Sequence, residues 1–245
     1  MRIDTACLLR KEKYRVRVDN HIHSGDYNTD ASNDLETTIP NAKEKNLGCF
    51  CITNHVWRSS NWINDYIEKA NSLRAKYQAK FFIGVEAKVL DIYGSIDFLL
   101  DTYDIEVILG SIHHLPSKKH SKWIDYSRIN EKKFQDVLYE TIMNLIENQQ
   151  IDIIAHPFSI FYERFGSFPE EYISNICRLA GKKEVAIEIF NSRHMIPISD
   201  FRNLVKYCLE YNTLMSIGSD AHGISEIGNI DYRFIYNEIE KQITS

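Results

Sequence analysis

Histidine and acidic side chains recur just after short apolar runs along this chain. Near its start, His21 and His23 stand one residue apart, after a stretch that alternates apolar and basic residues. Residues two apart on an extended strand point to the same side, so both imidazoles can bind one ion together. Asp220 and His222 repeat this spacing near the other end of the chain. The pattern predicts metal chemistry, because neutral imidazole and carboxylate are common ligands of zinc, manganese and iron.

Most of the histidines follow an expected strand directly. The polar residues at these strand ends are His21, His23, Asn54, His55, Glu86, His113, His114, His156, Glu188, Asn191, Arg193, Asp220 and His222. A single histidine after a strand is most often a hydrogen-bonded surface residue. Packing gives no reason to gather so many imidazoles, however, since each protonated ring repels the next. We therefore expect one metal cluster rather than separate surface residues.

The elements that must position these residues are short apolar strands that alternate with helices. The expected strands are 16–19, 49–53, 81–85, 106–109, 152–155, 185–190 and 214–217. The expected helices are 35–45, 62–78, 95–100, 131–148, 169–179, 198–210 and 232–242. Crossovers long enough for a helix imply parallel pairing, and so many units favour a closed α/β barrel with its chemistry at the C-terminal strand ends. A doubly wound sheet would usually show a glycine-rich loop after the first strand, and NHIHSGDYN is not one.

The composition is that of one globular domain. The chain has 245 residues, of which 44% are hydrophobic and 26% are charged. Barrels of this class commonly use about 250 residues for a single domain. No linker rich in Gly, Ser or Pro divides the sequence, so we expect one domain over residues 1–245.

Charge and hydropathy exclude several classes of partner. A net charge of −5 argues against a long nucleic acid, because duplex binders carry a basic surface. No run approaches the roughly 20 apolar residues of a membrane span. The N-terminus, MRIDTAC, also lacks the apolar core of a signal peptide. We expect a cytoplasmic protein with reduced, buried cysteines, which are Cys7, Cys49, Cys51, Cys177 and Cys208.

The strand-end motifs resemble those of the PHP family, named for polymerase and histidinol phosphatase. They read DNHIHS, ITNH, GVE, GSIHH, AHP and GSDAH, in this order from residue 19 to residue 222. Each motif alone is a weak signal, but six in order span nearly the whole chain. The resemblance implies a distorted seven-stranded (β/α)7 TIM-like barrel that holds divalent metal ions and hydrolyses phosphoesters. The length, the spacing and EIFN before GSDAH look most like the histidinol-phosphatase branch.

The resemblance also implies how the ligands divide among two to three ions of zinc, manganese or iron. The first ion would be bound by His21, His23, Glu86 and Asp220. The second would share Glu86 and add His113 and His156. The third would take His55, His222 and a carboxylate from the loop after His23, where Asp30 is preferred and Asp26 is the alternative.

Two residues depart from the family pattern or leave their role open. Asn54 stands where an aspartate is common, and we expect it to alter the tautomer or basicity of His55. His114 follows His113, and neighbours on an extended chain point in opposite directions, so both are not expected to bind one ion. His114 is open to three roles: a core residue, a hydrogen-bond donor to a ligand, or a proton donor to the leaving group.

The implied reaction is hydrolysis of a small phosphomonoester by a metal-bound hydroxide, with Glu86, Asp220 and His222 as the catalytic set. Divalent ions neutralise the phosphate and lower the pKa of bound water from 15.7 toward about 7. Arg193 and Arg164, expected on the same rim, are candidate phosphate-binding residues, because a guanidinium fork binds two oxygens at once. Arg58 is a further option.

Two other functions remain alternatives. A nuclease or nucleotide phosphodiesterase would use the same metals on longer substrates. The basic run KKHSK, residues 118–122, is the feature that favours it. A non-catalytic regulatory domain would need a decayed site, whereas here nearly every ligand position is filled. The sequence does not distinguish among small phosphoesters, and it gives no oligomeric state.

Overall fold

Seven parallel strands form the centre of the computed structural model, which describes residues 7–99, 103–148 and 150–244. They are β1 (Val18–Ile22), β2 (Cys49–Val56), β3 (Phe81–Lys88), β4 (Val107–Ser111), β5 (Ile153–Ala155), β6 (Ala186–Asn191) and β7 (Met215–Gly218). Each strand pairs in parallel with the next one in the sequence. Most strand positions are fully buried, as expected of a sheet covered on both faces.

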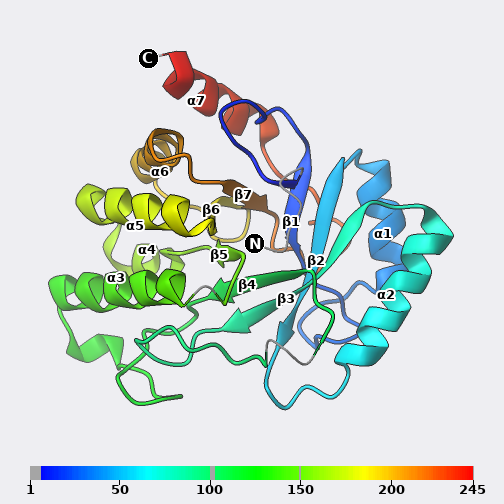
Figure 1. Ribbon diagram of the computed structural model, residues 1–245, viewed down its shortest axis with the longest axis horizontal. Coiled ribbons are helices and arrows are strands. Elements are labelled where there is room, and N and C mark those ends of the chain that lie inside the picture. The colour runs from blue at the N-terminus through cyan, green and yellow to red at the C-terminus, as the bar shows by residue number, and fades with distance from the viewer. Residues whose placement is uncertain (1–6, 100–102, 149, 245) are drawn as a thin grey trace.

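The sheet curls until its first and last strands meet (Figure 1). At the carboxyl ends, Ile22 forms a parallel bridge with Ala221, and His23 N–H donates to Ala221 O at 2.9 Å. At the opposite ends, Leu9 pairs in antiparallel fashion with Met215 through two backbone hydrogen bonds of 2.7 and 2.9 Å. The result is a nearly closed barrel, which confirms the expected α/β architecture.

Helices surround the strands (Figure 1). They are α1 (Leu35–Glu44), α2 (Ile63–Tyr77), α3 (Glu131–Glu147), α4 (Ser159–Phe165), α5 (Glu170–Lys183), α6 (Ile198–Glu210) and α7 (Tyr232–Thr244), with a 3₁₀ turn over Tyr126–Arg128. The longest, α3, shows why they pack this way. Its buried residues recur at helical spacing along one face, and they are Phe134, Val137, Leu138, Thr141, Ile142, Leu145 and Ile146.

Two expectations about local structure are wrong. Residues 95–99 form no helix, and residue 100 lies outside the described residues. Asp91 instead accepts hydrogen bonds from the backbone of Tyr93 and Ser95, which turns the chain back so that Ile96 bridges Val89. Conversely, the aromatic stretch after β5 lies outside the expected helices and contains α4, whose buried Phe161 packs in the core.

The expectation of five reduced cysteines is wrong for one pair. Cys7 and Cys49 form a disulfide, with their Cα atoms 5.5 Å apart. The N-terminal segment that pairs with β7 brings Cys7 beside the start of β2. Cys51, Cys177 and Cys208 are free and buried, as expected. None of the described helices has the length and apolarity that a membrane crossing requires.

Candidate metal centre

The carboxyl ends of the strands bring the expected side chains together beside one cavity of about 560 Å³. Four groups of residues place their ligand atoms within 4.8 Å of one another. These groups are His21–His23–Glu86, Glu86–His113–His156, His21–His156–Asp220 and His23–His55–His222. The first two match ligand sets expected from the sequence. The fold therefore gathers residues that lie up to about 200 positions apart in the chain.

Glu86, near the end of β3, lies at the centre of the cluster. Its Oε1 is 3.2 Å from the Nε2 atoms of both His113 and His156. Its Oε2 is 3.5 Å from the Nε2 atoms of both His21 and His23. The two carboxylate oxygens thus face different sets of imidazoles, which is the arrangement that a bridging ligand requires.

Three of these ligand atoms are buried and make no well-directed hydrogen bond in the described structure, although His55 Nδ1 lies 2.8 Å from Glu86 Oε2 and Asp220 Oδ1 lies 3.1 Å from His23 Nε2. The three atoms are His21 Nε2, His23 Nε2 and Glu86 Oε2. A buried polar atom that lacks a partner costs about 1–3 kcal/mol, and more if it is charged. The three atoms converge on one point, and two are imidazole nitrogens beside a carboxylate oxygen. This donor set fits a divalent metal ion.

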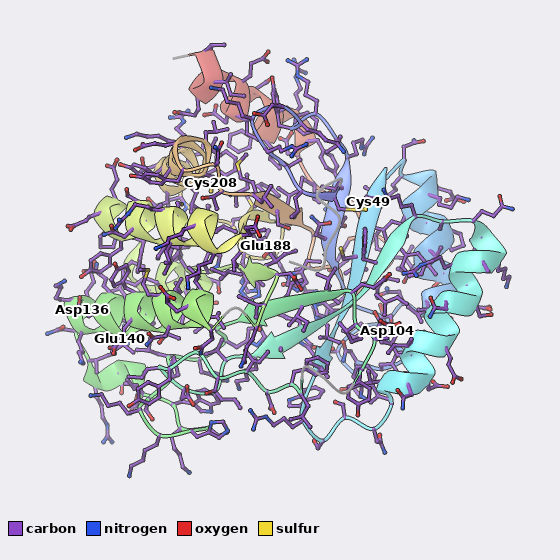
Figure 2. The ribbon with its side chains drawn as sticks, in the orientation of Figure 1. Cys49, Asp104, Asp136, Glu140, Glu188 and Cys208 are labelled. Atoms are coloured by element: carbon purple, nitrogen blue, oxygen red, sulfur yellow. A yellow bond between two sulfur atoms is a disulfide. The ribbon has the colours of Figure 1, made fainter. Side chains whose placement is uncertain are left out.

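The second ring nitrogen of His21, on β1, and of His23, just after β1, is held by a neighbouring side chain. His21 Nδ1 lies 3.1 Å from Glu188 Oε1, and His23 Nδ1 lies 3.3 Å from Asn28 Oδ1. Glu188 comes from β6 and lies among the strands, whereas Asp136 lies on the outer helix α3 (Figure 2). A donated Nδ1–H leaves Nε2 free to bind a metal. Sequence reasoning missed these two roles.

A network of hydrogen bonds to Asp19 positions Asp220. Asp19 on β1 accepts hydrogen bonds from Ser219 N–H at 2.8 Å, Ser219 O–H at 2.6 Å and Gly228 N–H at 2.8 Å. The segment after β7 is thereby tied to β1. Asp220 itself has a φ of +54°, in the left-handed region that non-glycine residues seldom adopt. His156 has a φ of +30°. The fold holds both side chains against a backbone preference.

Close approach of β7 to β1 also depends on one glycine. A Cβ atom at Gly218 would collide with the Cβ of His21 and with Oε1 of Glu188. Only glycine therefore allows β7 to lie against the histidine and the carboxylate that orients it.

Electrostatics show that the buried carboxylates need positive charge nearby. Burial lowers the pKa of His23 to about 4. Burial acts the same way on His21, but the carboxylates of Asp220, Glu188 and Glu86 outweigh it and raise the pKa of His21 well above its usual value. Burial would raise the pKa of Glu86, yet neighbouring histidines hold it well below its usual value. A bound cation would supply the charge that otherwise requires a proton on His21.

Asp30 and Asp26 are clearly separated by the structure. Asp30 Oδ2 lies 3.4 Å from His55 Nε2 and 3.5 Å from His222 Nε2. Asp26 is engaged elsewhere, since one oxygen accepts from Leu35 N–H at 2.7 Å and the other pairs with Lys69 at 2.8 Å. The geometry favours Asp30, the preferred candidate from the sequence.

Comparison with known proteins places this arrangement in a family. The family model described as the PHP domain matches residues 19–192. The chain belongs to the PHP domain family. This confirms the resemblance drawn from the strand-end motifs.

Relatives of this PHP domain are named as phosphatases. A probable histidinol-phosphatase from Clostridium acetobutylicum is 25% identical over 236 residues, which cover 86% of this chain and 88% of the relative. A probable phosphatase from Caldicellulosiruptor bescii is 29% identical over 234 residues, covering 88% of this chain and 84% of the relative. These names agree with the enzyme class expected from the sequence.

The fold of this PHP domain also matches a solved structure. Histidinol phosphate phosphatase from Lactococcus lactis, crystallised with zinc, L-histidinol and phosphate, superposes with a TM-score of 0.71 at 19% sequence identity. The match covers 92% of this chain and 93% of the other. At this identity the likeness shows the shared barrel.

The arginines chosen as phosphate-binding candidates lie in different places in the PHP domain. Arg193 lines the cavity, where its Nε donates to Asp220 O at 3.1 Å and its Nη2 pairs with Glu226 at 3.1 Å. Arg164 ends α4 with its guanidinium 4.9 Å from the centre of the Phe165 ring, and it is not among the residues that line the cavity. Arg58 is likewise absent from that lining and donates to Ile96 O.

The structure also shows the surroundings of His114 and Asn54, the two residues whose roles the sequence leaves open. His114 is exposed and lies beside Trp123, with ring centres 5.4 Å apart, so it is not a core residue. Asn54 is fully buried and binds the backbone and side chain of Ser24 at 2.7 and 3.2 Å. Asn54 therefore positions the loop that follows β1, and in the described structure its amide hydrogen-bonds Ser24 rather than the His55 ring.

The cavity is also lined by residues that sequence reasoning did not select as site residues. They include Trp57, Lys88 and His194. His194 Nε2 lies 3.5 Å from Asp220 Oδ2, and its ring is 4.5 Å from that of His156. His194 follows Arg193 on the β6–α6 connection and does not directly follow an expected strand, so the strand-end pattern does not include it.

Proposed function

We propose that this chain is a metal-dependent phosphatase that hydrolyses a small phosphomonoester, and that residues 1–245 act as one PHP domain. The observation that carries the proposal is the convergence of buried imidazole nitrogens and carboxylate oxygens at the cavity, among which His21 Nε2, His23 Nε2 and Glu86 Oε2 make no well-directed hydrogen bond. Such atoms are costly unless a cation binds them. The phosphatase names of the relatives support the reaction class.

The proposed ligand sets follow the geometry. The first ion takes His21, His23, Glu86 and Asp220, the second takes Glu86, His113 and His156, and the third takes His55, His222 and Asp30. Two or three divalent ions of zinc, manganese or iron in these positions would neutralise the phosphate and acidify bound water. Glu188 and Asn28 would accept the Nδ1 protons of His21 and His23, which would leave both Nε2 atoms free to hold the ions.

Arg193 is the residue we propose for binding the phosphate. Its Nε and Nη2 are held by Asp220 O and Glu226, which fixes the plane of the guanidinium beside the cavity. The remaining Nη1 donors are then oriented for a phosphate oxygen. Arg164 is not among the described residues that line the cavity, and we assign it no contact with the substrate.

The experiment that tests this function combines metal content with phosphate release. Protein purified without chelator should carry at least two transition-metal ions per chain and release phosphate from small monoesters. Glu86→Gln removes the bridging charge, so both metal content and activity should fall. Glu238→Gln is a matched control, because Glu238 is a buried carboxylate on α7 that pairs with Arg202 and Lys241. Full activity in metal-free protein would refute the proposal.

A nuclease is the second candidate, and one observation favours it. Lys118, Lys119 and Lys122 are exposed on a hairpin. Trp123, on the same hairpin, makes a cation–π contact with the cavity-lining Lys88. Affinity for a polyanion falls steeply with salt when several such cations bind phosphates. Efficient, salt-sensitive cleavage of single-stranded DNA or RNA, with little release from small monoesters, would make the nuclease the correct assignment.

We place the activity in the cytoplasm, where phosphorylated metabolites are handled. The Cys7–Cys49 disulfide argues against this location, because disulfides are rare in the reducing cytoplasm. Cell fractionation, together with thiol titration of the freshly isolated protein, tests this location.

A further inference from the structure

Beyond the proposed ligands, the charged side chains of the cavity are cationic. Asp30, Glu86 and Asp220 are the carboxylates among its described lining residues, and all three are proposed to bind metal. The other charged lining residues are Lys88 and Arg193. A substrate phosphate needs the ions and one arginine, so Lys88 has no task in the reaction proposed above.

Lys88 is placed to reach the bound molecule. It ends β3, two residues after Glu86, so both side chains point to the same face of the strand. Its Nζ lies 4.2 Å from the centre of the Trp123 ring, a cation–π contact that holds the side chain in place. Asp97 interacts electrostatically with Lys88 from beyond 4 Å, and over the described part of the chain no carboxylate oxygen lies within 4 Å of this ammonium. Its N–H donors are therefore available to a ligand.

The two cations stand on different sides of the metal cluster. Lys88 comes from β3 and Arg193 follows β6, and these strands are separated by β4 and β5 in the barrel order. The cavity of about 560 Å³ falls in the range of roughly 300–1,000 Å³ that small ligands occupy. A small molecule can therefore present its phosphate to the ions and Arg193 while another of its groups meets Lys88.

We infer that Lys88 selects substrates that carry a carboxylate in addition to the phosphomonoester. This inference rests on the proposed phosphatase function and narrows its substrate class. A carboxylate matches the single charge of the lysine, whereas the amino group of an amino-alcohol phosphate would be repelled. The chain is thus distinguished from an enzyme that prefers a cationic substrate, despite the names of its relatives.

The nearest alternative is an amine-binding carboxylate beside the cavity. Glu163 lines a separate, smaller pocket that shares Arg193 and His194 with the main cavity. A substrate amine could reach Glu163 only past these two side chains. Preference for an amine that Glu163→Gln abolishes would therefore overturn the inference.

The experiment compares substrate pairs that differ in the carboxylate. 3-Phosphoglycerate and glycerol 3-phosphate form one pair, and phosphoserine and phosphoethanolamine form the other. With metal-loaded wild-type protein, kcat/KM should be about tenfold or more higher for the acid of each pair. Lys88→Met should remove that preference by lowering kcat/KM for the acids, and Lys88→Arg should retain most of it. Lys133→Met, which removes an exposed charge on α3 outside the cavity lining, should change neither.

A binding measurement separates this inference from the proposed reaction. Calorimetry should show that 3-phosphonopropionate binds the wild type more tightly than propylphosphonate does, and that Lys88→Met removes the difference without changing metal content. Equal loss for acids and non-acids in Lys88→Met would refute the inference, as would a wild type without preference. If no monoester is hydrolysed but the binding preference is present, the phosphatase proposal fails and the anion-selective role of Lys88 stands.

Discussion

Replacing Glu188 by glutamine should weaken metal binding while leaving the protein folded. Glu188 is 3% exposed and touches the expected ligands without being one of them. Its Oε1 accepts from His21 Nδ1 at 3.1 Å. Its Oε2 accepts from His156 N–H at 2.7 Å and from the Asn191 amide at 3.1 Å. Glutamine keeps the shape but replaces one acceptor oxygen by an NH₂ group, which cannot accept from these donors.

The size of the effect follows from these contacts. A hydrogen bond to a charged group contributes about 1.5–3 kcal/mol, and the variant loses one such bond at His21 or His156. Loss of a partner that orients a metal-binding histidine typically costs about 10–100-fold in metal affinity. That range equals about 1.4–2.7 kcal/mol, so the two estimates agree. We expect the dissociation constant of the tightest site to rise by this factor.

The assay is a competition titration of the metal-free protein against a chromogenic chelator. Glu238→Gln provides the control, since it also removes a buried charge, but one that pairs with Arg202 on α6 and Lys241 on α7. It should lower the melting temperature and leave metal affinity unchanged. Circular dichroism of each variant shows whether the fold persists. A folded Glu188→Gln protein with wild-type metal affinity would refute the argument that Glu188 orients His21.

Two further predictions concern the loops around the barrel. Asp30→Asn should weaken only the last step of a stepwise metal titration, whereas Asp26→Asn should leave all steps unchanged because its oxygens are engaged elsewhere. Burial would raise the pKa of Asp91, but hydrogen bonds from His120 and from its own loop outweigh it and lower that pKa. Its stabilising contribution is therefore present above the unfolded pKa of about 3.9 and is lost as the pH falls through the folded value. At pH 7 the melting temperature of Asp91→Asn should be lower than that of the wild type, and this difference should narrow below pH 4. A difference in melting temperature that does not change with pH would contradict the argument.

Much of the site was predictable because ligand residues follow strands. Because side chains alternate along a strand, the spacing alone places His21 and His23 on the same side of it. In the structure, the Nε2 atoms of both lie 3.5 Å from Glu86 Oε2. All seven strands form, although most extend one to three residues further toward the site than the apolar runs indicate. The ladder continues through polar residues such as His55 because backbone hydrogen bonds do not depend on side-chain polarity.

The roles that were missed depend on contacts distant in sequence. Glu188 is recognisable as a polar residue near a strand end, but only the barrel shows that it contacts His21, 167 residues away. Lys88 reads as an ordinary strand-end lysine until β3 is seen to line the cavity. The Cys7–Cys49 pair depends on an N-terminal segment that pairs with β7, for which the local sequence gives no signal.

The most direct test of the central claim is phosphate release measured against the number of ions bound per chain. Metal-stripped protein would be reloaded stepwise with zinc, manganese or iron, and each sample assayed on small phosphomonoesters. The account predicts no release above background until ions fill the sites that share Glu86, and full release only when both are occupied. Substantial release from stripped protein, or activity independent of bound ions, would contradict it.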